Sequence, residues 1–423
     1  MLEQLEGSRA VARAVALCRA EVIPAYPISP QTHIVEALSA MVKDGELAPC
    51  EFLNVESEFA AMSVAIGASA TGARTYTATA SQGLLYMAEA LYNASGLGLP
   101  IVMTVANRAI GAPINIWNDH SDSMSQRDSG WIQLYVESNQ EAVETHLLAF
   151  RLAEELSLPV MVCMDGFVLT HAFERIDMPS QQDVDAYLPA YEPRQVLDPA
   201  EPVTIGAMVG PEAFTEVRYL AHVKHAQALA RIPELADELA EVLGRPHRAG
   251  QRQGGLVRGY RCDGADTVVV ALGSVLGTIE DAVDSLRERG VAVGALAVRA
   301  FRPFPSEAVR EALAGAARVV VLERALAVGV GGIVTQDVRA ALASAAVHVH
   351  TVVAGLGGRP ITSSALERLF ELAVDDRLDE LTFLDLNHEL VERELARTRE
   401  TRRSGPHAEN MLRDVGAIAA GPV

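Results

Sequence analysis

Short apolar runs alternate with helical patterns along the first 175 residues. The runs VIPAY, IVMTVA and LPVMVCMD have the length of buried strands, whereas VARAVALCRA and QTHIVEALSAMV place apolar residues at helical spacing. The same alternation returns from TVVVALG to VHVHTVVAG in the C-terminal half of the chain. Strands that alternate with helices favour parallel sheets covered by helices. We therefore predict an α/β chain with two doubly wound domains.

The pattern divides the chain into four parts. The first α/β domain covers residues 1–175, and an irregular connecting segment with scattered prolines and the polar stretch RAGQRQGG covers 176–255. The second α/β domain covers 256–372. Residues 373–423 contain many charged residues in a helical pattern and are expected to form a helical tail.

Composition limits the kinds of partner. Of the 423 residues, 49% are hydrophobic and 21% charged, which is typical of globular domains with sizeable cores. Thirty-five basic and 55 acidic residues give a net charge of −20. This charge has the wrong sign for binding nucleic acid or an anionic membrane. No apolar run approaches the roughly 20 residues of a membrane span, so we expect none.

The cysteines indicate that any redox cluster lies elsewhere. Cys18, Cys50, Cys163 and Cys262 are widely spaced and form no C-x-x-C pair, so local cysteines cannot build a zinc site or an iron–sulfur cluster. Any redox centre is expected on another chain. The N-terminal stretch MLEQLEGSRAVARAV lacks the apolar core of a signal peptide, and a cytoplasmic location is expected.

Ser29 lies in YPISPQT, directly after the predicted strand VIPAY. One interpretation is an N-cap residue, with Pro30 at the first helical position. The other is a ligand contact, because open α/β sheets bind ligands where strands end and helices begin. Both interpretations remain open at this point, since one serine can serve both purposes.

Glu58 opens a helix that is otherwise almost wholly apolar and built from small residues, NVESEFAAMSVAIGASATG. An unpartnered carboxylate at the mouth of a core is energetically costly, so Glu58 is a candidate partner for a cofactor nitrogen. The neighbouring Glu56 fits an exposed acid at a helix N-terminus. The later turn Ser81, Gln82 and Gly83 opens another helix and offers backbone N–H groups to a flat polar ligand, although Gly83 is equally explained by close packing.

Arg108 follows the strand IVMTVA and requires an anion, which is either a bound carboxylate or a structural ion-pair partner. The loop beyond it contains Trp117, Asp119 and His120. Asp119, His120 and Asp122 have metal-ligand side chains but no fixed helical spacing, so we expect the loop to line a pocket and predict no metal site.

Several of these motifs together resemble the α subunit of the 2-oxoacid:ferredoxin oxidoreductases, thiamine-diphosphate enzymes that include pyruvate:ferredoxin oxidoreductase. The matching stretches occur in order along nearly the whole chain: YPISPQT, VESE, TATASQGL, ANRA, INIWNDHSDSMSQRDSGW, MDGF, FRPFP and GLGGRPIT. The resemblance is strongest to the separate α subunits of multi-subunit members.

The resemblance implies how the cofactors are shared. The first domain would bind the pyrimidine end of thiamine diphosphate, and the second would be like the C-terminal domain of transketolase. Mg²⁺ and the diphosphate would lie on a β subunit, and [4Fe-4S] clusters on β and on a δ-type subunit. The complex would contain β, γ and δ-type partner subunits. Coenzyme A would accept the acyl group, and ferredoxin or a similar acceptor would take the electrons.

The resemblance also assigns roles to three residues. Glu58 matches the glutamate that hydrogen-bonds the pyrimidine N1′. Arg108 matches the arginine that receives the substrate carboxylate. Ser29 stands where the family pattern Y-P-I-T-P has threonine, which keeps the hydroxyl and removes a methyl group. The expected reaction is oxidative decarboxylation of a 2-oxoacid, with pyruvate as the first choice and aryl or branched-chain acids as further possibilities.

Two other functions fit parts of the pattern. One is the β subunit of a lipoamide-linked 2-oxoacid dehydrogenase, which has related domains and a similar glutamate. The other is a non-catalytic nucleotide-binding module in which the VGVGG stretch contacts phosphate, although Gly329, Gly331 and Gly332 are first interpreted as turn glycines. The order of the motifs favours the ferredoxin-linked family over both.

Overall fold

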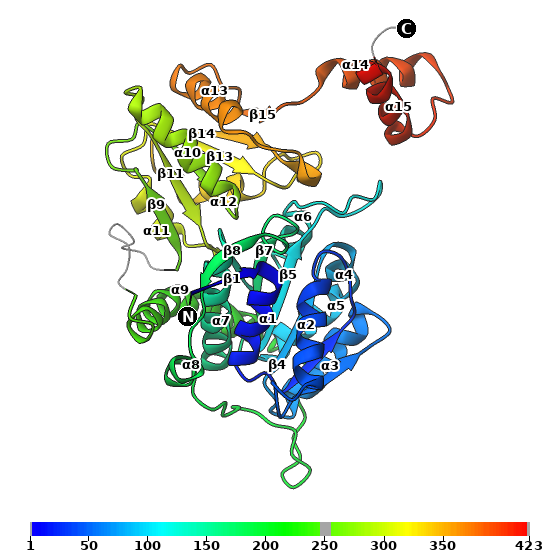
Figure 1. The fold of residues 1–423 in the computed structure, drawn as a ribbon, viewed down its shortest axis with the longest axis vertical. Helices are drawn as coiled ribbons and strands as arrows, with labels where there is room; N and C mark the ends of the chain where they lie inside the picture. The colour runs from blue at the N-terminus through cyan, green and yellow to red at the C-terminus, as the bar shows by residue number, and fades with distance from the viewer. Residues whose placement is uncertain (1, 246–254, 421–423) are drawn as a thin grey trace.

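The first domain is built on a seven-stranded sheet (Figure 1). The computed structural model describes residues 2–245 and 255–420, with side chains as far as residue 416. The strand order is β12-β6-β7-β5-β4-β2-β3, and every pairing is parallel except that of β12 with β6. The strands are β2 (Val22–Ala25), β3 (Glu51–Asn54), β4 (Thr75–Thr79), β5 (Ile101–Asn107), β6 (Ile132–Tyr135), β7 (Val160–Asp165) and β12 (Ala300–Arg302).

Helices cover this sheet, as the alternating pattern predicts. They are α1 (Gly7–Leu17), α2 (Thr32–Lys43), α3 (Glu58–Ala70), α4 (Ser81–Tyr86), α5 (Ala88–Leu97), α6 (Ser121–Ser125) and α7 (Asn139–Leu156). Helix α3 packs against β2 and β4, and α7 packs against β5 and β7. All residues of β4, β5 and β7 are buried, which explains why these strands are continuous apolar or small-residue runs.

The second domain has a six-stranded sheet in the order β15-β14-β13-β10-β11-β9, parallel except for β9. Its strands are β9 (Val257–Tyr260), β10 (Thr267–Ala271), β11 (Val293–Val298), β13 (Arg318–Glu323), β14 (His348–Val353) and β15 (Leu381–Phe383). Its helices are α10 (Val275–Glu288), α11 (Ser306–Ala312), α12 (Val334–Ala341), α13 (Ser363–Val374) and the 3-10 turn η1 (Leu356–Gly358). The α/β fold with two domains is confirmed.

Two segments differ from the predicted division. The stretch expected to be irregular contains α8 (Gln181–Tyr187) and the 29-residue helix α9 (Phe214–Val242). Buried residues at helical spacing hold α9 against α7: Ala228, Ile232, Leu235 and Leu239. Most of the RAGQRQGG stretch lies outside the described residues.

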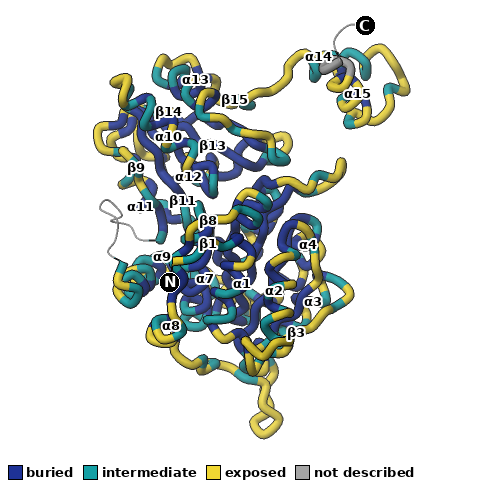
Figure 2. The backbone as a smooth tube through the Cα atoms, in the orientation of Figure 1, coloured by how far each residue is buried: buried dark blue, intermediate teal, exposed yellow. Residues whose placement is uncertain are grey.

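The expected helical tail begins with a strand, because β15 adds to the second sheet beyond residue 372. The remaining helices α14 (His388–Glu400) and α15 (His407–Ala420) form a hairpin that stands away from both domains (Figure 1). Figure 2 shows buried residues concentrated in the two sheet domains, while the segment leading to the hairpin is largely exposed. Among the described residues, no helix has the length and apolar character needed to cross a membrane.

A small antiparallel ribbon completes the first domain. It pairs β1 (Leu2–Glu6) with β8 (Phe173–Asp177), so that Glu6 lies opposite Phe173. The ribbon therefore brings the start of α1 to the turn that follows β7. The two large domains are also joined through β12, whose Ala300 pairs with Leu134 of the first sheet.

Candidate active site

The candidate residues gather at one edge of the first sheet. Ser29 follows β2, Glu58 follows β3, Ser81 follows β4 and Arg108 follows β5. These four strands are neighbours in the order β5-β4-β2-β3 and run parallel, so their carboxyl ends share an edge. Ligand sites of open α/β sheets lie at this edge.

Ser29 is not a helix cap, and this part of the sequence interpretation is wrong. Helix α2 begins at Thr32, its N-cap residue is Gln31, and Pro30 lies in the preceding turn rather than at the first helical position. The Gln31 side chain turns back and donates a 2.9 Å hydrogen bond to the carbonyl of Tyr26, which fixes the turn. Ser29 itself is exposed, so its hydroxyl is available to a ligand.

Glu58 is a buried carboxylate at the first position of α3, with only 8% of its surface exposed. Ser57 caps the helix by accepting a 3.2 Å hydrogen bond from the Ala60 N–H. Within the described ranges, 2–245 and 255–420, no protein group hydrogen-bonds the Glu58 carboxylate. Glu56 is exposed and lies before the helix begins. The buried Glu58 carboxylate therefore needs a hydrogen-bond partner and has none among the described residues, whereas the exposed Glu56 is in contact with water.

Gly83 leaves room beside this carboxylate. A Cβ atom at Gly83 would lie 2.6 Å from Thr79 Oγ1 and 2.7 Å from Glu58 Oε1, so any larger residue would have to displace one of them. Thr79 Oγ1 is buried and has no hydrogen-bond partner among the described residues. The space next to Gly83 therefore contains the Glu58 carboxylate and the Thr79 hydroxyl, neither of which has a hydrogen-bond partner among the described residues.

Arg108 is a buried cation held by backbone groups. Its Nε donates to the Asn115 carbonyl at 3.1 Å and its Nη1 to the Ser29 carbonyl at 2.9 Å. No carboxylate in the described part of the chain forms an ion pair with its guanidinium, so the structural ion pair considered from the sequence is absent there. Burial lowers the pKa of Arg108, while Asp122 opposes that shift.

Asp122 connects the separate parts of this edge, whereas sequence reasoning considered it only as a metal-ligand side chain in the loop. Its Oδ2 accepts 2.9 Å hydrogen bonds from the N–H groups of Ser81 and Arg108, and its Oδ1 accepts from Asn107 and Ser123. Burial raises the pKa of Asp122 to about 6, although these hydrogen bonds oppose the shift. One carboxylate thus fixes the start of α4 to the end of β5.

The turn Ser81, Gln82 and Gly83 is held to the Arg108 loop by further contacts. The Ser81 hydroxyl donates to the Ala109 carbonyl, and Gln82 Nε2 donates to the Gly111 carbonyl at 3.2 Å. Ser81 is fully buried, with a positive φ of 50°. Its N–H is already engaged by Asp122, so this N–H is not free for a ligand.

The loop residues Trp117, Asp119 and His120 lie against the second domain: the His120 N–H donates a 2.7 Å hydrogen bond to the Arg324 carbonyl, and a Cβ atom at Gly358 would lie 2.4 Å from the Trp117 Cβ. Asp119 Oδ2 accepts a 3.0 Å hydrogen bond from the Gly357 N–H in η1. His120 is buried and its Nε2 lies 2.9 Å from Asp165 Oδ1. Trp117 is 52% exposed, and its ring centroid lies 4.9 Å from that of Phe167. The loop therefore contacts the second domain through its buried end, while Trp117 and the neighbouring Ile114 and Ile116 are exposed.

Asp165 joins the two domains, and the sequence analysis missed it. It ends β7, and its Oδ2 accepts hydrogen bonds from Arg324 Nη1 at 2.8 Å and from the Ser274 N–H at 2.8 Å. Burial alone would raise the pKa of Asp165, but Arg324 and His120 outweigh burial and lower it. An aspartate directly after the apolar run LPVMVCM was the available signal, because it ends β7 in register with Asn107, the residue before Arg108.

Comparison with known proteins decides the family. The family model described as "Pyruvate flavodoxin/ferredoxin oxidoreductase, thiamine diP-bdg" matches residues 13–237, and "Pyruvate:ferredoxin oxidoreductase core domain II" matches 265–366. The pyruvate synthase subunit PorA of Methanosarcina barkeri is 48% identical over 396 residues, which cover 92% of this chain and 97% of that protein. The chain belongs to the 2-oxoacid:ferredoxin oxidoreductase family, as an α subunit.

Other relatives agree with this assignment. PorA of Methanothermobacter thermautotrophicus is 45% identical over 87% of this chain and 94% of its own length. The ketoisovalerate oxidoreductase subunit VorA of Pyrococcus abyssi is 39% identical over 87% of this chain and 92% of its own length. The chain is thus a subunit of a thiamine-diphosphate-dependent 2-oxoacid:ferredoxin oxidoreductase. Neither the lipoamide-linked dehydrogenase nor the non-catalytic module is retained.

A solved structure supports the fold. The 2-oxoglutarate:ferredoxin oxidoreductase from Magnetococcus marinus, with 2-oxoglutarate, coenzyme A and succinyl-CoA bound, matches with a TM-score of 0.64 and 19% identity. The match covers 88% of this chain and 65% of that chain. This solved structure thus has a similar α/β fold within a longer chain.

Proposed function

We propose that this α subunit acts on pyruvate in a complex that forms acetyl-CoA and CO2 and reduces ferredoxin. Two electrons leave the substrate as its carboxylate is lost, and coenzyme A takes the acyl group. The relatives named pyruvate synthase support pyruvate as the substrate, because their identities of 48% and 45% exceed the 39% of the ketoisovalerate subunit.

The observation that carries the proposal is the unpaired Arg108. A buried guanidinium without a counter-ion is costly, and its planar fork is suited to a carboxylate. The two carbonyl acceptors on Asn115 and Ser29 fix Nε and Nη1 and leave Nη2 for an incoming anion. Arg108 would bind and orient the substrate carboxylate, while the exposed Ser29 hydroxyl beside it would donate a further hydrogen bond.

The residues around Gly83 fit the pyrimidine end of thiamine diphosphate. When bound, this cofactor supplies the nucleophilic carbon and the electron sink for decarboxylation. Glu58 would accept a hydrogen bond from a protonated ring nitrogen and hold that proton, since its carboxylate has no partner among the described residues. Thr79 Oγ1, buried and equally unpartnered in the described ranges, would serve a second polar atom of the ring.

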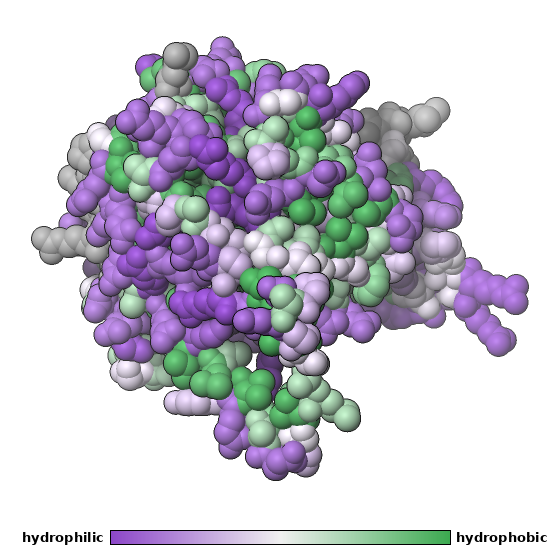
Figure 3. Space-filling model, turned by 90° about the horizontal axis from the view of Figure 1, so that it is seen from below, coloured by the Kyte–Doolittle hydropathy of each residue, from purple (hydrophilic) through white to green (hydrophobic). Residues whose placement is uncertain are grey.

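The partner chains complete the site in this proposal. A β subunit would hold Mg²⁺ and the diphosphate, and β and δ-type subunits would carry [4Fe-4S] clusters. Exposed apolar side chains near Glu58 support a covering partner: Phe59, Leu85, Tyr86 and Tyr92. Figure 3 shows similar apolar patches between hydrophilic regions on the face seen from below.

The test is purification of the chain with the products of neighbouring genes, followed by a substrate panel. The complex should be brown, and pyruvate should give the highest kcat/KM for coenzyme A-dependent dye reduction. The other substrates are 2-oxoisovalerate, 2-oxoglutarate and phenylglyoxylate. A colourless complex would contradict the electron path, and a higher kcat/KM with another acid would contradict pyruvate.

A further inference from the structure

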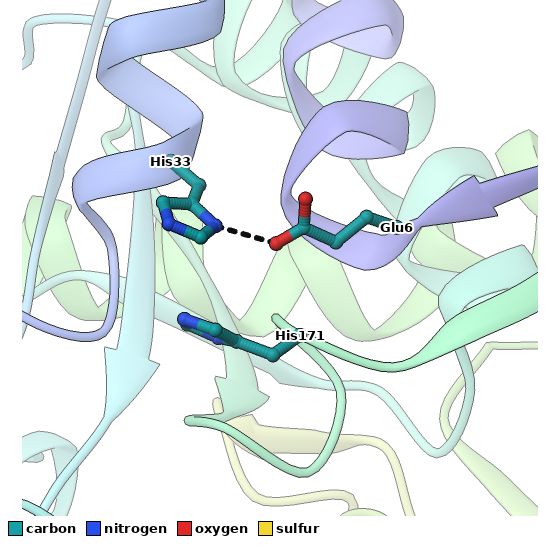
Figure 4. Close-up of side chains that lie close together, drawn as sticks. All are labelled: Glu6, His33 and His171. Atoms are coloured by element: carbon teal, nitrogen blue, oxygen red, sulfur yellow. Dashed lines mark hydrogen bonds and ion pairs between the residues drawn. The ribbon is translucent and has the colours of Figure 1, made fainter.

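A second group of chemically active side chains lies outside the candidate active site. Glu6 ends β1, His33 lies in the first turn of α2, and His171 lies in the turn after β7. One ligand atom from each residue lies within 4.8 Å of the other two (Figure 4). We infer that Glu6, His33 and His171 bind one divalent transition-metal ion of the zinc class.

The three side chains converge closely. His33 Nδ1 lies 2.5 Å from Glu6 Oε1, and the two imidazole ring centroids are 4.7 Å apart. Ligand atoms about 2.0 to 2.2 Å from a zinc ion are separated by little more than 3 Å, so small side-chain rotations would close the set. Two imidazoles and one carboxylate, with further positions open to water, form a known transition-metal ligand set.

A hydrogen bond to Thr170 sets the tautomer of His171 that leaves Nε2 free to bind a metal. His171 Nδ1 lies 2.7 Å from Thr170 Oγ1, which also accepts a 2.8 Å hydrogen bond from the Phe167 N–H. With Nδ1–H donating to this hydroxyl, Nε2 keeps its lone pair for a metal, an arrangement typical of metal-binding histidines.

The turn that carries His171 is firmly placed. The Thr170 carbonyl accepts hydrogen bonds from the Ser8 N–H at 2.9 Å and from its hydroxyl at 2.8 Å. A Cβ atom at Gly7 would lie 2.1 Å from the Leu169 carbonyl oxygen, so the start of α1 approaches the turn more closely than any larger residue allows. Glu6 and His171 are therefore held at a fixed separation by the backbone.

An ordinary ion pair explains less of this geometry. Glu6 is 6% exposed and needs a cation, and a protonated His33 alone could supply one. The imidazole of His171, tilted against that of His33, would then repel the protonated His33 or contribute nothing to the pair. Arg9 contacts the other carboxylate oxygen, with Nε 3.4 Å from Oε2, and its side chain is largely exposed. Metal coordination accounts for all three side chains, because Glu6 Oε1 faces the two imidazoles.

The ion would stabilise the position of α2 at one side of the active site and would take no part in the reaction. Helix α2 follows the turn that contains Ser29, and Gly166 approaches Pro30 so closely that a Cβ atom would lie 2.5 Å from its ring. A metal at this site would link α2, the start of α1 and the turn after β7. The inference does not depend on the substrate or on the partner chains.

Zinc titration of the full chain after removal of metal by a chelator tests the inference. Calorimetry should show one site with a Kd of about 1 µM or below, and the melting temperature should rise with zinc. His33→Ala and His171→Ala should each lose this site, and Thr170→Val should weaken binding about 10- to 100-fold. His348→Ala is the control, because His348 stacks on His350 with centroids 4.3 Å apart in the second domain.

Co²⁺ provides the second measurement. The metal-loaded chain should show the visible absorption of nitrogen and oxygen ligands, and His171→Ala should lose it. Zinc binding that survives both histidine substitutions, a cobalt spectrum of thiolate coordination, or no binding at 100 µM zinc would overturn the inference. If His171→Ala does not fold, Glu6→Gln with the same titration replaces it.

Discussion

The guanidinium of Arg108 is tied to the backbone of Ser29 through the 2.9 Å hydrogen bond from Nη1 to the carbonyl oxygen. The bond links residues 79 positions apart in the sequence, after two different strands of the sheet. Because the acceptor is a carbonyl, a change of the Ser29 side chain leaves it in place. Ser29 variants can therefore separate the effect of its hydroxyl from the positioning of Arg108.

Glu58→Gln should lower kcat about 10²- to 10⁴-fold in the assembled complex, because the amide cannot hold the proton that the carboxylate would. The fold should be unchanged, since no described group hydrogen-bonds the carboxylate. Glu56→Gln is the matched control and should be nearly silent, because Glu56 is exposed. Steady-state kinetics at saturating cofactor measures both, and a larger loss for Glu56→Gln would refute the assignment.

Gly83→Ala should lower activity strongly, although the substitution adds only one methyl group. The new Cβ would lie 2.7 Å from Glu58 Oε1 and 2.6 Å from Thr79 Oγ1, so the carboxylate or α4 must move. We expect a loss of about 1 to 3 kcal/mol in stability and weaker cofactor binding. Gly67→Ala in α3 is the control, since its Cβ meets nothing within 4 Å. It should raise stability by about 0.5 to 1 kcal/mol. Thermal unfolding and cofactor titration distinguish the two variants. Equal effects of Gly83→Ala and Gly67→Ala would contradict a cofactor site beside Gly83.

Asp122 should make stability depend on pH between about 4 and 6. Its folded pKa of about 6 lies above the usual value for aspartate, so the folded state binds the proton more tightly than the unfolded state. The stability difference between the wild type and Asp122→Asn should therefore fall by about 3 kcal/mol as pH rises from 4 to 6. Above pH 6 the difference should be constant. Urea unfolding of both proteins across this range measures it, and a difference independent of pH would count against the raised pKa.

Asp165→Asn should weaken the junction of the two domains. The substitution leaves buried Arg324 without its carboxylate, and breaking a buried pair costs about 3 to 5 kcal/mol. Asp185→Asn, which removes an exposed pair with Arg19, should cost no more than about 1 kcal/mol. Urea unfolding provides the comparison.

The pH dependence of Asp165 has the opposite sign to that of Asp122. Its folded pKa is lowered, so its stabilisation is complete above the ordinary aspartate pKa of about 4 and is lost as pH falls below it. Equal losses for Asp165→Asn and Asp185→Asn would show that the junction does not depend on this carboxylate.

The sequence predicted those features that follow from local pattern. Apolar runs such as IVMTVA became buried strands, and the residues directly after them, including Arg108, lie at the ligand-binding edge of the sheet. Glu58 was identified because a carboxylate stands at the start of an otherwise apolar helix. The N-cap interpretation of Ser29 was wrong, because α2 begins at Thr32 with Gln31 as its N-cap residue, two positions later than the Ser-Pro pattern indicates.

Contacts between distant segments could not be predicted in the same way. Asp165 and Arg324 are 159 residues apart, and Glu6 comes close to His171 because β1, which ends at Glu6, pairs with β8, which follows the His171 turn. Each residue is ordinary in its local sequence, and only the fold brings the partners together. The long helix α9 was missed because its buried residues are few and because its polar residues, its Pro233 and the prolines before it suggested a linker.

The most direct test of the account is Arg108→Ala in the assembled complex, with kinetics and thermal unfolding measured on the same sample. We expect a higher KM for the 2-oxoacid and a loss of about 2 to 5 kcal/mol in kcat/KM. Arg108→Lys should recover only part of this, because a point charge lacks the planar fork. Ser29→Ala should cost about 1 kcal/mol through loss of one neutral hydrogen bond. A large fall in melting temperature with unchanged kcat/KM per folded molecule would contradict the account and make Arg108 a structural residue.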